Sequence, residues 1–168
     1  ENLPTHGGSN RVYAKRIENI GLDIDKNVQR NIENEIRIGL DELSTYHRFA
    51  ERVENSKNQL MDLLGNCKDR GKKIISYGAT YKSTTIYNYC NINADLISYI
   101  VDITPGKQGK YSPGAHIPII SPDEGFDSSV DYAFLGAWNF LDEILQKEKN
   151  YSDRGGKFIT HVPNVRIV

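Results

Sequence analysis

The amino-acid sequence predicts an α/β protein: a Rossmann-like, mostly parallel β-sheet flanked by helices and preceded by a long helical segment. Two observations lead to this fold class. From residue 73 onward, short apolar runs alternate with helical stretches, which is the pattern of parallel strands joined by crossover helices. Between residues 25 and 70, apolar residues instead recur at steps of three and four, as they do along one face of a helix.

The helical segment at residues 25–70 contains a break. Residues 39–42 interrupt the periodic pattern, so two helices are predicted, the second at residues 41–69 and ending near Gly71. The apolar positions that define the two helices are Ile32, Ile36, Leu40, Phe49, Val53, Leu60, Leu63 and Leu64.

The sheet is predicted from short apolar runs that are typical of buried strands. The predicted strands are residues 73–77, 97–101, 117–120, 132–135 and 157–161, with a further short one in NVRIV at residues 164–168. Helices are predicted at residues 83–90 and 138–149. A chain of 168 residues is long enough to bury one core of this kind.

Composition and charge exclude several classes of function. Acidic and basic residues are interleaved and the formal net charge is −1, so we expect no non-specific binding to nucleic acid or to membranes. No apolar run approaches the roughly 20 residues that cross a bilayer, and the first residues are polar, unlike a signal peptide. Cys67 and Cys90 have neither zinc-site nor redox-pair spacing. The sequence therefore predicts a cytoplasmic protein without a metal site.

Residues 11–16, RVYAKR, alternate apolar and polar side chains like a half-exposed strand. A strand with no neighbour cannot pair its own backbone groups, so this segment is interpreted as the end of something longer. The chain is accordingly divided into residues 1–24, the tail of an upstream domain with a linker, and residues 25–168, the Rossmann-like domain with its N-terminal helices.

The junction after the strand at residues 73–77 has the chemistry of a phosphate-binding loop. Ligands of parallel sheets bind at the carboxyl ends of strands, where a helix presents unpaired N–H groups and the positive end of its dipole. A glycine permits close approach of the backbone, a lysine adds a cation, and hydroxyl groups cap the helix or donate to phosphate oxygens. The candidate residues are Gly78, Ala79, Thr80, Lys82, Ser83 and Thr84. Because Gly-x-Gly-x-x-Gly and the Walker pattern are absent, a capped turn without a ligand is an equal alternative.

The next strand and the loop after it place further candidate residues at the carboxyl edge of the predicted sheet. Asp102 ends that strand, where Rossmann folds hold an acid against a ribose, although a surface aspartate is as consistent with the pattern. The long irregular loop at residues 103–120 carries Lys107 and His116, and such loops are often functional. The alternative is a solvated loop with a structural histidine.

Trp138 and Asn139 open a helix directly after the strand at residues 132–135. An aromatic side chain there can cover a base or a sugar, and the asparagine can cap the helix or bond to a ligand. The alternative is a core tryptophan beside an N-cap.

Several motifs occur in a familiar order: THGGSNRVYAKR, YGATYKSTT, YIVDITPGKQGKYSPGAHIPI, LGAWNF and GGKFI. Together they resemble the C-terminal domain of the nucleotide-sugar C-methyltransferases, over nearly the whole chain. The resemblance implies a parent enzyme with an N-terminal zinc-binding segment, a central S-adenosylmethionine domain, and this Rossmann-like domain. Residues 6–9 and the predicted strand after them would then belong to the end of the central domain. Zinc, S-adenosylmethionine and the catalytic residues are then expected outside this chain, with no cofactor bound here. One departure is Ser83, because the family usually has a glycine after the lysine.

The resemblance also implies a function, which is to position a nucleotide-linked keto sugar for C-methylation. The diphosphate is expected to contact Lys82, the amides of residues 78–83 and Lys107. The residues expected to border the nucleoside or the sugar are His116, Trp138 and Asn139. The implied partners are the nucleotide-linked sugar and the upstream methyltransferase domain.

Two alternative functions remain open. One is a free-standing module that binds a nucleotide sugar without catalysis. The other is a small Rossmann oxidoreductase or isomerase in which Tyr77 or Tyr81 acts as an acid beside Lys82. The missing dinucleotide fingerprint and the five-residue spacing from Tyr77 to Lys82 speak against the second.

Overall fold

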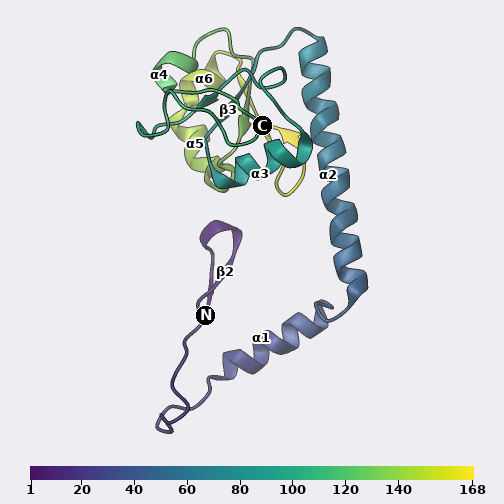
Figure 1. Ribbon diagram of the computed structural model, residues 1–168, viewed down its shortest axis with the longest axis vertical. Coiled ribbons are helices and arrows are strands. Elements are labelled where there is room, and N and C mark those ends of the chain that lie inside the picture. The colour runs from purple at the N-terminus through teal and green to yellow at the C-terminus, as the bar shows by residue number, and fades with distance from the viewer. The chain divides into compact units, whose positions relative to one another are not determined.

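All 168 residues are described in the computed structural model, which divides into two compact units, Glu1–Val53 and Glu54–Val168 (Figure 1). The long helix α2 (Leu43–Asp69) contributes to both units. The predicted division after residue 24 stays a prediction, because compactness alone does not identify the domain to which a segment belongs. No helix combines the length and the apolar character that a bilayer crossing requires.

The first unit consists of a small hairpin, an irregular connection, helix α1 and the start of α2. Strands β1 (Asn2–Leu3) and β2 (Ser9–Asn10) pair antiparallel around the 3-10 turn η1 (Thr5–Gly7). Helix α1 (Lys26–Arg37) begins where the Asp25 side chain accepts a hydrogen bond from the Asn27 amide. No residue of this unit is buried, so the unit has no hydrophobic core of its own.

The predicted strand at residues 11–16 is wrong. The hairpin ladder ends at Asn10, and only Arg11 extends it, through the hydrogen bond from its amide to the Glu1 carbonyl (2.8 Å). Beyond Arg11 no strand lies alongside, and an alternating pattern without a partner cannot form a ladder. The side chains of Val12 and Tyr13 are exposed.

The second unit is built on a six-stranded sheet with the order β5-β4-β3-β6-β7-β8. Its strands are β3 (Ile74–Tyr77), β4 (Ile100–Val101), β5 (Ile119–Ile120), β6 (Tyr132–Leu135), β7 (Lys157–Thr160) and β8 (Arg166–Ile167). All neighbouring pairs are parallel except β7 and β8, which confirms the predicted mostly parallel α/β sheet. The direction of winding reverses between β3 and β6, and in such sheets a crevice opens at the carboxyl ends of the two strands.

Strands β4 and β5 are shorter than predicted. The prediction assigned every buried apolar residue of each run to a strand, although a buried residue need not pair with a neighbouring strand. Ile97 is fully buried, but it lies in a turn in which the amides of Leu96 and Ile97 both donate to the Asn93 carbonyl. Ile117 is also fully buried, and its amide donates to the Ser112 side chain instead of to a strand (3.0 Å). Strands β4 and β5 therefore begin two or three residues later than the apolar runs suggest.

The helices of the second unit are the C-terminal part of α2, α3 (Tyr81–Cys90), α4 (Pro122–Gly125), α5 (Leu141–Lys147) and α6 (Lys149–Asp153). The single helix predicted at residues 138–149 is wrong in detail. The 3-10 turn η2 (Trp138–Phe140) comes first, and Glu148 separates α5 from α6 with non-helical backbone angles (φ −98°, ψ 29°). At this break the Glu148 carboxylate accepts a hydrogen bond from the Tyr77 hydroxyl (2.6 Å).

Strand β3 shows how the sheet acquires two cores. Successive side chains of a strand point to opposite faces, so Ile74 packs with residues of α2 and α3, whereas Ile75 and Tyr77 pack with residues of α5 and α6. The free cysteines Cys67 and Cys90 are buried in the first of these clusters. The carboxyl ends of the central strands lie between the two helical layers.

Candidate functional site

The loop after β3 turns sharply at Gly78. Its φ of 92° lies in the region that favours glycine, and a side chain there would also bring a Cβ within 3.1 Å of the Ala137 Cβ. The Gly78 amide donates to the Val101 carbonyl of β4 (2.8 Å). Gly78 therefore shapes the loop, and its N–H is already paired within the sheet.

Helix α3 begins with a capping box. The Thr80 side chain accepts from the Ser83 amide (3.0 Å), and the Ser83 hydroxyl accepts from the Thr80 amide (2.9 Å). Thr84 also turns its hydroxyl inward, to the Thr80 carbonyl (3.0 Å). The predicted hydroxyl residues therefore cap the helix. The first-turn amides of Tyr81 and Lys82 have no partner within the protein, as is usual for the first residues of a helix.

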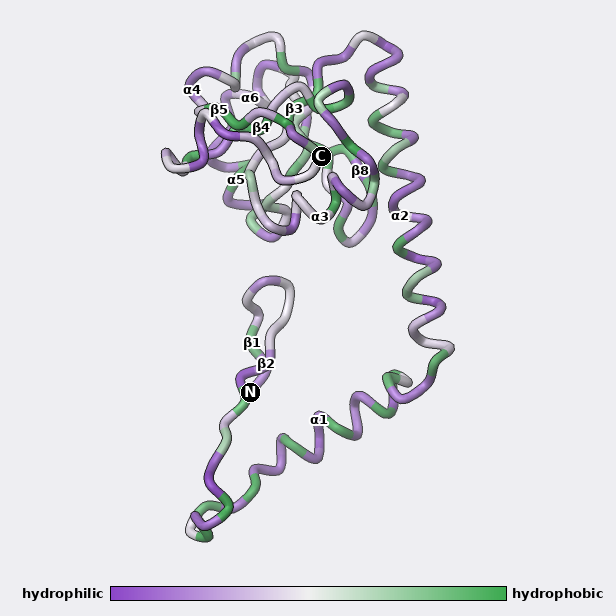
Figure 2. The backbone as a smooth tube through the Cα atoms, in the orientation of Figure 1, coloured by the Kyte–Doolittle hydropathy of each residue, from purple (hydrophilic) through white to green (hydrophobic).

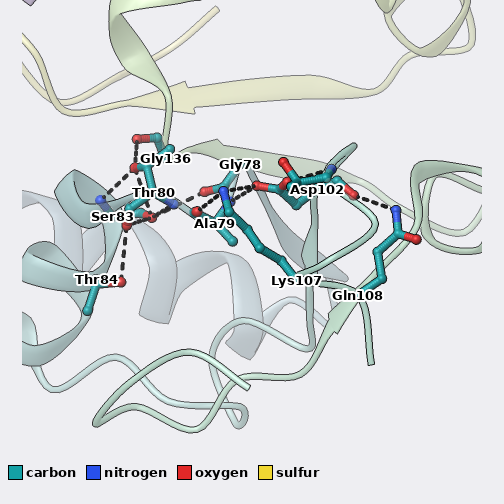
Figure 3. Close-up of polar contacts among 10 residues, drawn as sticks. Gly78, Ala79, Thr80, Ser83, Thr84, Asp102, Lys107, Gln108 and Gly136 are labelled. Carbon is teal, nitrogen blue, oxygen red and sulfur yellow. Dashed lines mark hydrogen bonds and ion pairs between the residues drawn. The ribbon is translucent and has the colours of Figure 1, made fainter. Parts of the chain in front are cut away.

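Asp102 occupies the position next to the Ala79 amide. Its carboxylate accepts hydrogen bonds from the Ala79 amide (2.8 Å) and from the Lys107 ammonium (3.2 Å), as Figure 3 shows. It also accepts one from the Thr104 amide (2.8 Å). Lys107 also donates to the Ala79 carbonyl (2.8 Å). The Asp102 side chain is only 6% exposed. The Asp102 carboxylate therefore points toward the loop after β3 and stabilises it through these hydrogen bonds.

The hydrogen-bond partners of Asp102 determine the pKa of its carboxyl group. Burial alone raises the pKa of the Asp102 carboxyl, but hydrogen bonds from Thr104, the Ala79 amide and Lys107 outweigh burial and lower the pKa. Asp102 is accordingly ionised near neutral pH, and it is paired with Lys107. The Ala79 amide is therefore already occupied by Asp102, whereas the amides of Tyr81 and Lys82 in the first turn of α3 have no partner.

Gly136 joins this loop to the one that follows β6. Its carbonyl accepts from the Thr80 hydroxyl (2.9 Å), and its amide donates to the Tyr77 carbonyl (2.9 Å). A Cβ at Gly136 would lie 2.4 Å from the Gly78 carbonyl oxygen and 2.7 Å from the Ser83 Cβ, so only glycine fits. Sequence reasoning missed Gly136, although its place directly after a buried strand was a usable signal.

Lys82, Trp138 and Asn139 come together at the reversal point of the sheet. The Lys82 ammonium donates to the Asn139 side-chain oxygen (3.0 Å) and lies 4.6 Å from the centre of the Trp138 ring. Tyr81, the neighbour of Lys82, is 96% exposed. These four residues are called the Lys82 corner. It presents one cation, the Trp138 ring beside that cation, and the two unpaired first-turn amides of α3.

His116 is not brought to this corner. It is exposed, with a φ of 52°, in a turn that packs on the far part of α3, where the Asn88 side chain donates to the Pro113 carbonyl (3.1 Å). Asn88 follows Lys82 by six residues, which is about 9 Å along a helix. Lys107 is also separate from the corner, because its ammonium is held by Asp102 and Ala79.

His161, at the carboxyl end of β7, is a residue that sequence reasoning placed only inside a strand. Its ring stacks on Phe134, with the ring centres 5.4 Å apart, and its Nδ1 is buried without a hydrogen-bond partner. Burial lowers the pKa of His161 to about 4. The imidazole is therefore neutral in the folded protein at neutral pH.

A cavity of about 610 Å³ lies on the α5 and α6 side of the sheet, at the carboxyl ends of β4 and β5, where Ile103, Gln108 and Ser121 also line it. Phe126, Tyr151, Lys147, Glu148 and Arg154 are among the residues that line it, and it contains none of the predicted site residues. Its positive and negative side chains are mixed, so its charge favours no particular class of ligand. No group of three His, Cys, Asp or Glu side chains in the structure is suited to hold a metal ion.

The sequence is similar to known proteins. Residues 4–163 match the family model described as the C-methyltransferase C-terminal domain. The chain is also similar to the C-methyltransferase NovU of Streptomyces niveus, with 34% identity over 163 residues, which is 97% of this chain and 39% of that relative. The chain thus spans about two fifths of the length of this relative.

Proposed function

Because the chain belongs to the C-methyltransferase C-terminal domain family, we propose that it holds a nucleotide-linked keto sugar in place for C-methylation. The observation that carries this proposal is the convergence of Lys82, Asn139 and Trp138, with contacts of 3.0 and 4.6 Å, at the point where the sheet reverses. Ligands of doubly wound sheets bind at this point.

The Lys82 corner has the groups that a nucleoside diphosphate needs. The amides of Tyr81 and Lys82 and the Lys82 ammonium are donors for phosphate oxygens, and the N-terminus of α3 adds its positive dipole end. The rings of Trp138 and Tyr81 can stack on a base or cover a sugar. In this proposal Gly78, Ala79, Thr80, Ser83 and Thr84 shape the loop.

The contribution to catalysis is positioning. A base outside this chain would remove the acidic proton next to the ketone, and the resulting carbanion would take the methyl group, which S-adenosylmethionine supplies when bound to the parent enzyme. Binding energy from the remote diphosphate and base can hold the reacting carbon in line, which lowers the barrier by fixing orientation. We expect no activity from this chain alone, and we place zinc and S-adenosylmethionine on the preceding part of the parent protein.

For the oxidoreductase alternative, the geometry separates one of its two candidate acids, Tyr77, from Lys82. The Tyr77 hydroxyl donates to Glu148 and packs in the cluster of α5 and α6, whereas Lys82 belongs to α3, which covers the other face. Tyr77 and Lys82 therefore share no partner. A free-standing binding module would use the same corner, and the reading frame upstream of Glu1 distinguishes it from a methyltransferase domain.

Calorimetric titration of the 168-residue chain with thymidine diphosphate tests the proposal. We expect weak binding that Lys82→Ala weakens about tenfold, because one charge-assisted contact contributes about 1.5 kcal/mol or more. Lys110→Ala is the matched control, because Lys110 is an exposed lysine of the loop after β4 and its ammonium makes no hydrogen bond or ion pair. Equal effects of the two substitutions, or tighter binding of a nicotinamide dinucleotide, would contradict the proposal.

A further inference from the structure

The first unit exposes apolar side chains that a folded protein normally covers. Most of the large exposed apolar residues of the chain lie in it, although it is the smaller unit. They are Val12, Tyr13, Ile17, Ile20, Leu22, Ile24, Val28, Ile32, Ile36, Ile38, Leu40, Leu43, Tyr46 and Phe49. Scattered apolar residues on a surface are normal, but contiguous apolar patches mark interaction sites.

The residues of α1 form such a contiguous patch. Val28, Ile32 and Ile36 follow one another at steps of four, so they lie on one face of the helix, with exposures of 50%, 45% and 57%. Figure 2 shows this alternation of apolar and polar segments along α1. We call these three residues the α1 stripe. The remaining residues of α1 are all polar or charged, so only the stripe favours burial.

A helix of 12 residues such as α1 has only marginal stability by itself in water. Isolated helices shorter than about 12 to 15 residues are marginal, and proteins stabilise them by packing an amphipathic face. The three side chains of the stripe are still about half exposed, so covering them removes further apolar surface from water and favours docking.

We propose that the α1 stripe docks on the part of the same methyltransferase that precedes this chain. The matched family is a C-terminal domain, and the match to NovU covers only 39% of that relative, so in NovU most of the protein lies outside the matched region. A domain joined to α1 through one chain is present at a high effective concentration, which favours it over a separate partner. This inference does not depend on nucleotide binding at the Lys82 corner.

Hydrogen exchange tests the proposal on the full reading-frame product and on the 168-residue chain. We expect the amides of Lys26–Arg37 to exchange about 100-fold more slowly in the longer protein, since each 1.4 kcal/mol of docking energy is a factor of ten. Equal exchange in both proteins overturns the proposal, and so does a reading frame that starts near Glu1.

A pair of substitutions separates docking from helix content. In the longer protein, Ile32→Asp should return the exchange of α1 to the fast rates of the 168-residue chain, whereas Asn34→Asp, on the opposite side of the helix, should leave it slow. Neither change should alter the melting temperature of the 168-residue chain. Protection of α1 in the 168-residue chain itself contradicts the proposal: if it rises with concentration, a second copy is the occupant, and if it does not, the chain covers its own stripe.

Discussion

Helix α1 and the C-terminal half of α2 carry the same kind of apolar pattern, with opposite outcomes. Ile32 and Ile36 are half exposed, whereas Leu60 and Leu64, also four residues apart, are 1% and 0% exposed. The difference lies in the neighbourhood, because Leu60 and Leu64 pack in one cluster with Ile74 of β3, and the α1 stripe has no such neighbour within its unit. An amphipathic period shows that a helix has a face to cover, but it does not show what covers that face.

The largest expected effect comes from shortening one apolar side chain in each helix. Leu64→Ala should lower the free energy of unfolding by about 3 kcal/mol, because it leaves a cavity in a packed core. Ile32→Ala should change it by less than about 0.5 kcal/mol in the 168-residue chain, because its side chain is half exposed and lies outside any packed core. Urea unfolding followed by the fluorescence of Trp138 measures both. Similar losses in the two variants would mean that Ile32 is buried in a core that unfolds together with the sheet, and would contradict this contrast.

The pH dependence of unfolding provides a second contrast, between two histidines. Partial burial lowers the pKa of the half-buried His161 to about 4 from an ordinary value of 6.5, so in this interval the unfolded chain binds more protons than the folded one. Above pH 6.5 this residue therefore costs the folded state no stability. As the pH falls from 6.5 toward 4, the unfolded chain takes up the proton first, and the free energy of unfolding decreases. Acidification from pH 7 to 4.5 should cost about 2 kcal/mol through this residue alone.

Two variants test whether His161 causes this pH dependence of the stability. His161→Phe keeps the ring on Phe134 but cannot take a proton, so the fall in stability between pH 6.5 and 4.5 should become shallower. His116→Asn is the matched control, because His116 is exposed and asparagine tolerates its positive φ. An unchanged slope in His161→Phe would show that another group is responsible.

The smallest expected effect compares the N-caps of the two units. Thr80→Ala, at the start of α3, should destabilise the second unit by about 1 kcal/mol, because the Ser83 amide loses its acceptor. Asp25→Ala removes the corresponding acceptor at the start of α1 and should leave the global unfolding curve unchanged, with faster exchange of the α1 amides as the only consequence. A global effect of Asp25→Ala would mean that α1 unfolds together with the sheet.

Much of the fold followed from the sequence. The strand at residues 132–135 was predicted with its observed bounds, and the break at residues 39–42 separates α1 from α2. Residues such as Ile97 and Ile117 could not be assigned correctly, because hydrophobicity reports burial, and a turn can bury a side chain as well as a strand can. The segment at residues 11–16 failed for the related reason that alternation does not supply a neighbouring strand.

The candidate site was predictable only in part. Lys82, Trp138 and Asn139 follow two strands whose carboxyl ends are adjacent, so the rule for parallel sheets brings them together. The role of Asp102 was not accessible in this way, because its contact with the Ala79 amide depends on the path of the loop after Gly78. The same holds for His116, whose loop is directed to the far part of α3 by the contact of Asn88 with Pro113.

The most direct test of the Lys82 corner is an NMR titration of the 168-residue chain with thymidine diphosphate. We predict that the largest shifts occur at the backbone amides of Tyr81 and Lys82 and at the Trp138 indole N–H, and that the amide of Ala79, which is bonded to Asp102, moves little. Shifts confined to Lys147, Tyr151 and Arg154, around the cavity on the α5 and α6 side of the sheet, would contradict the account, and so would the absence of any shift at millimolar ligand.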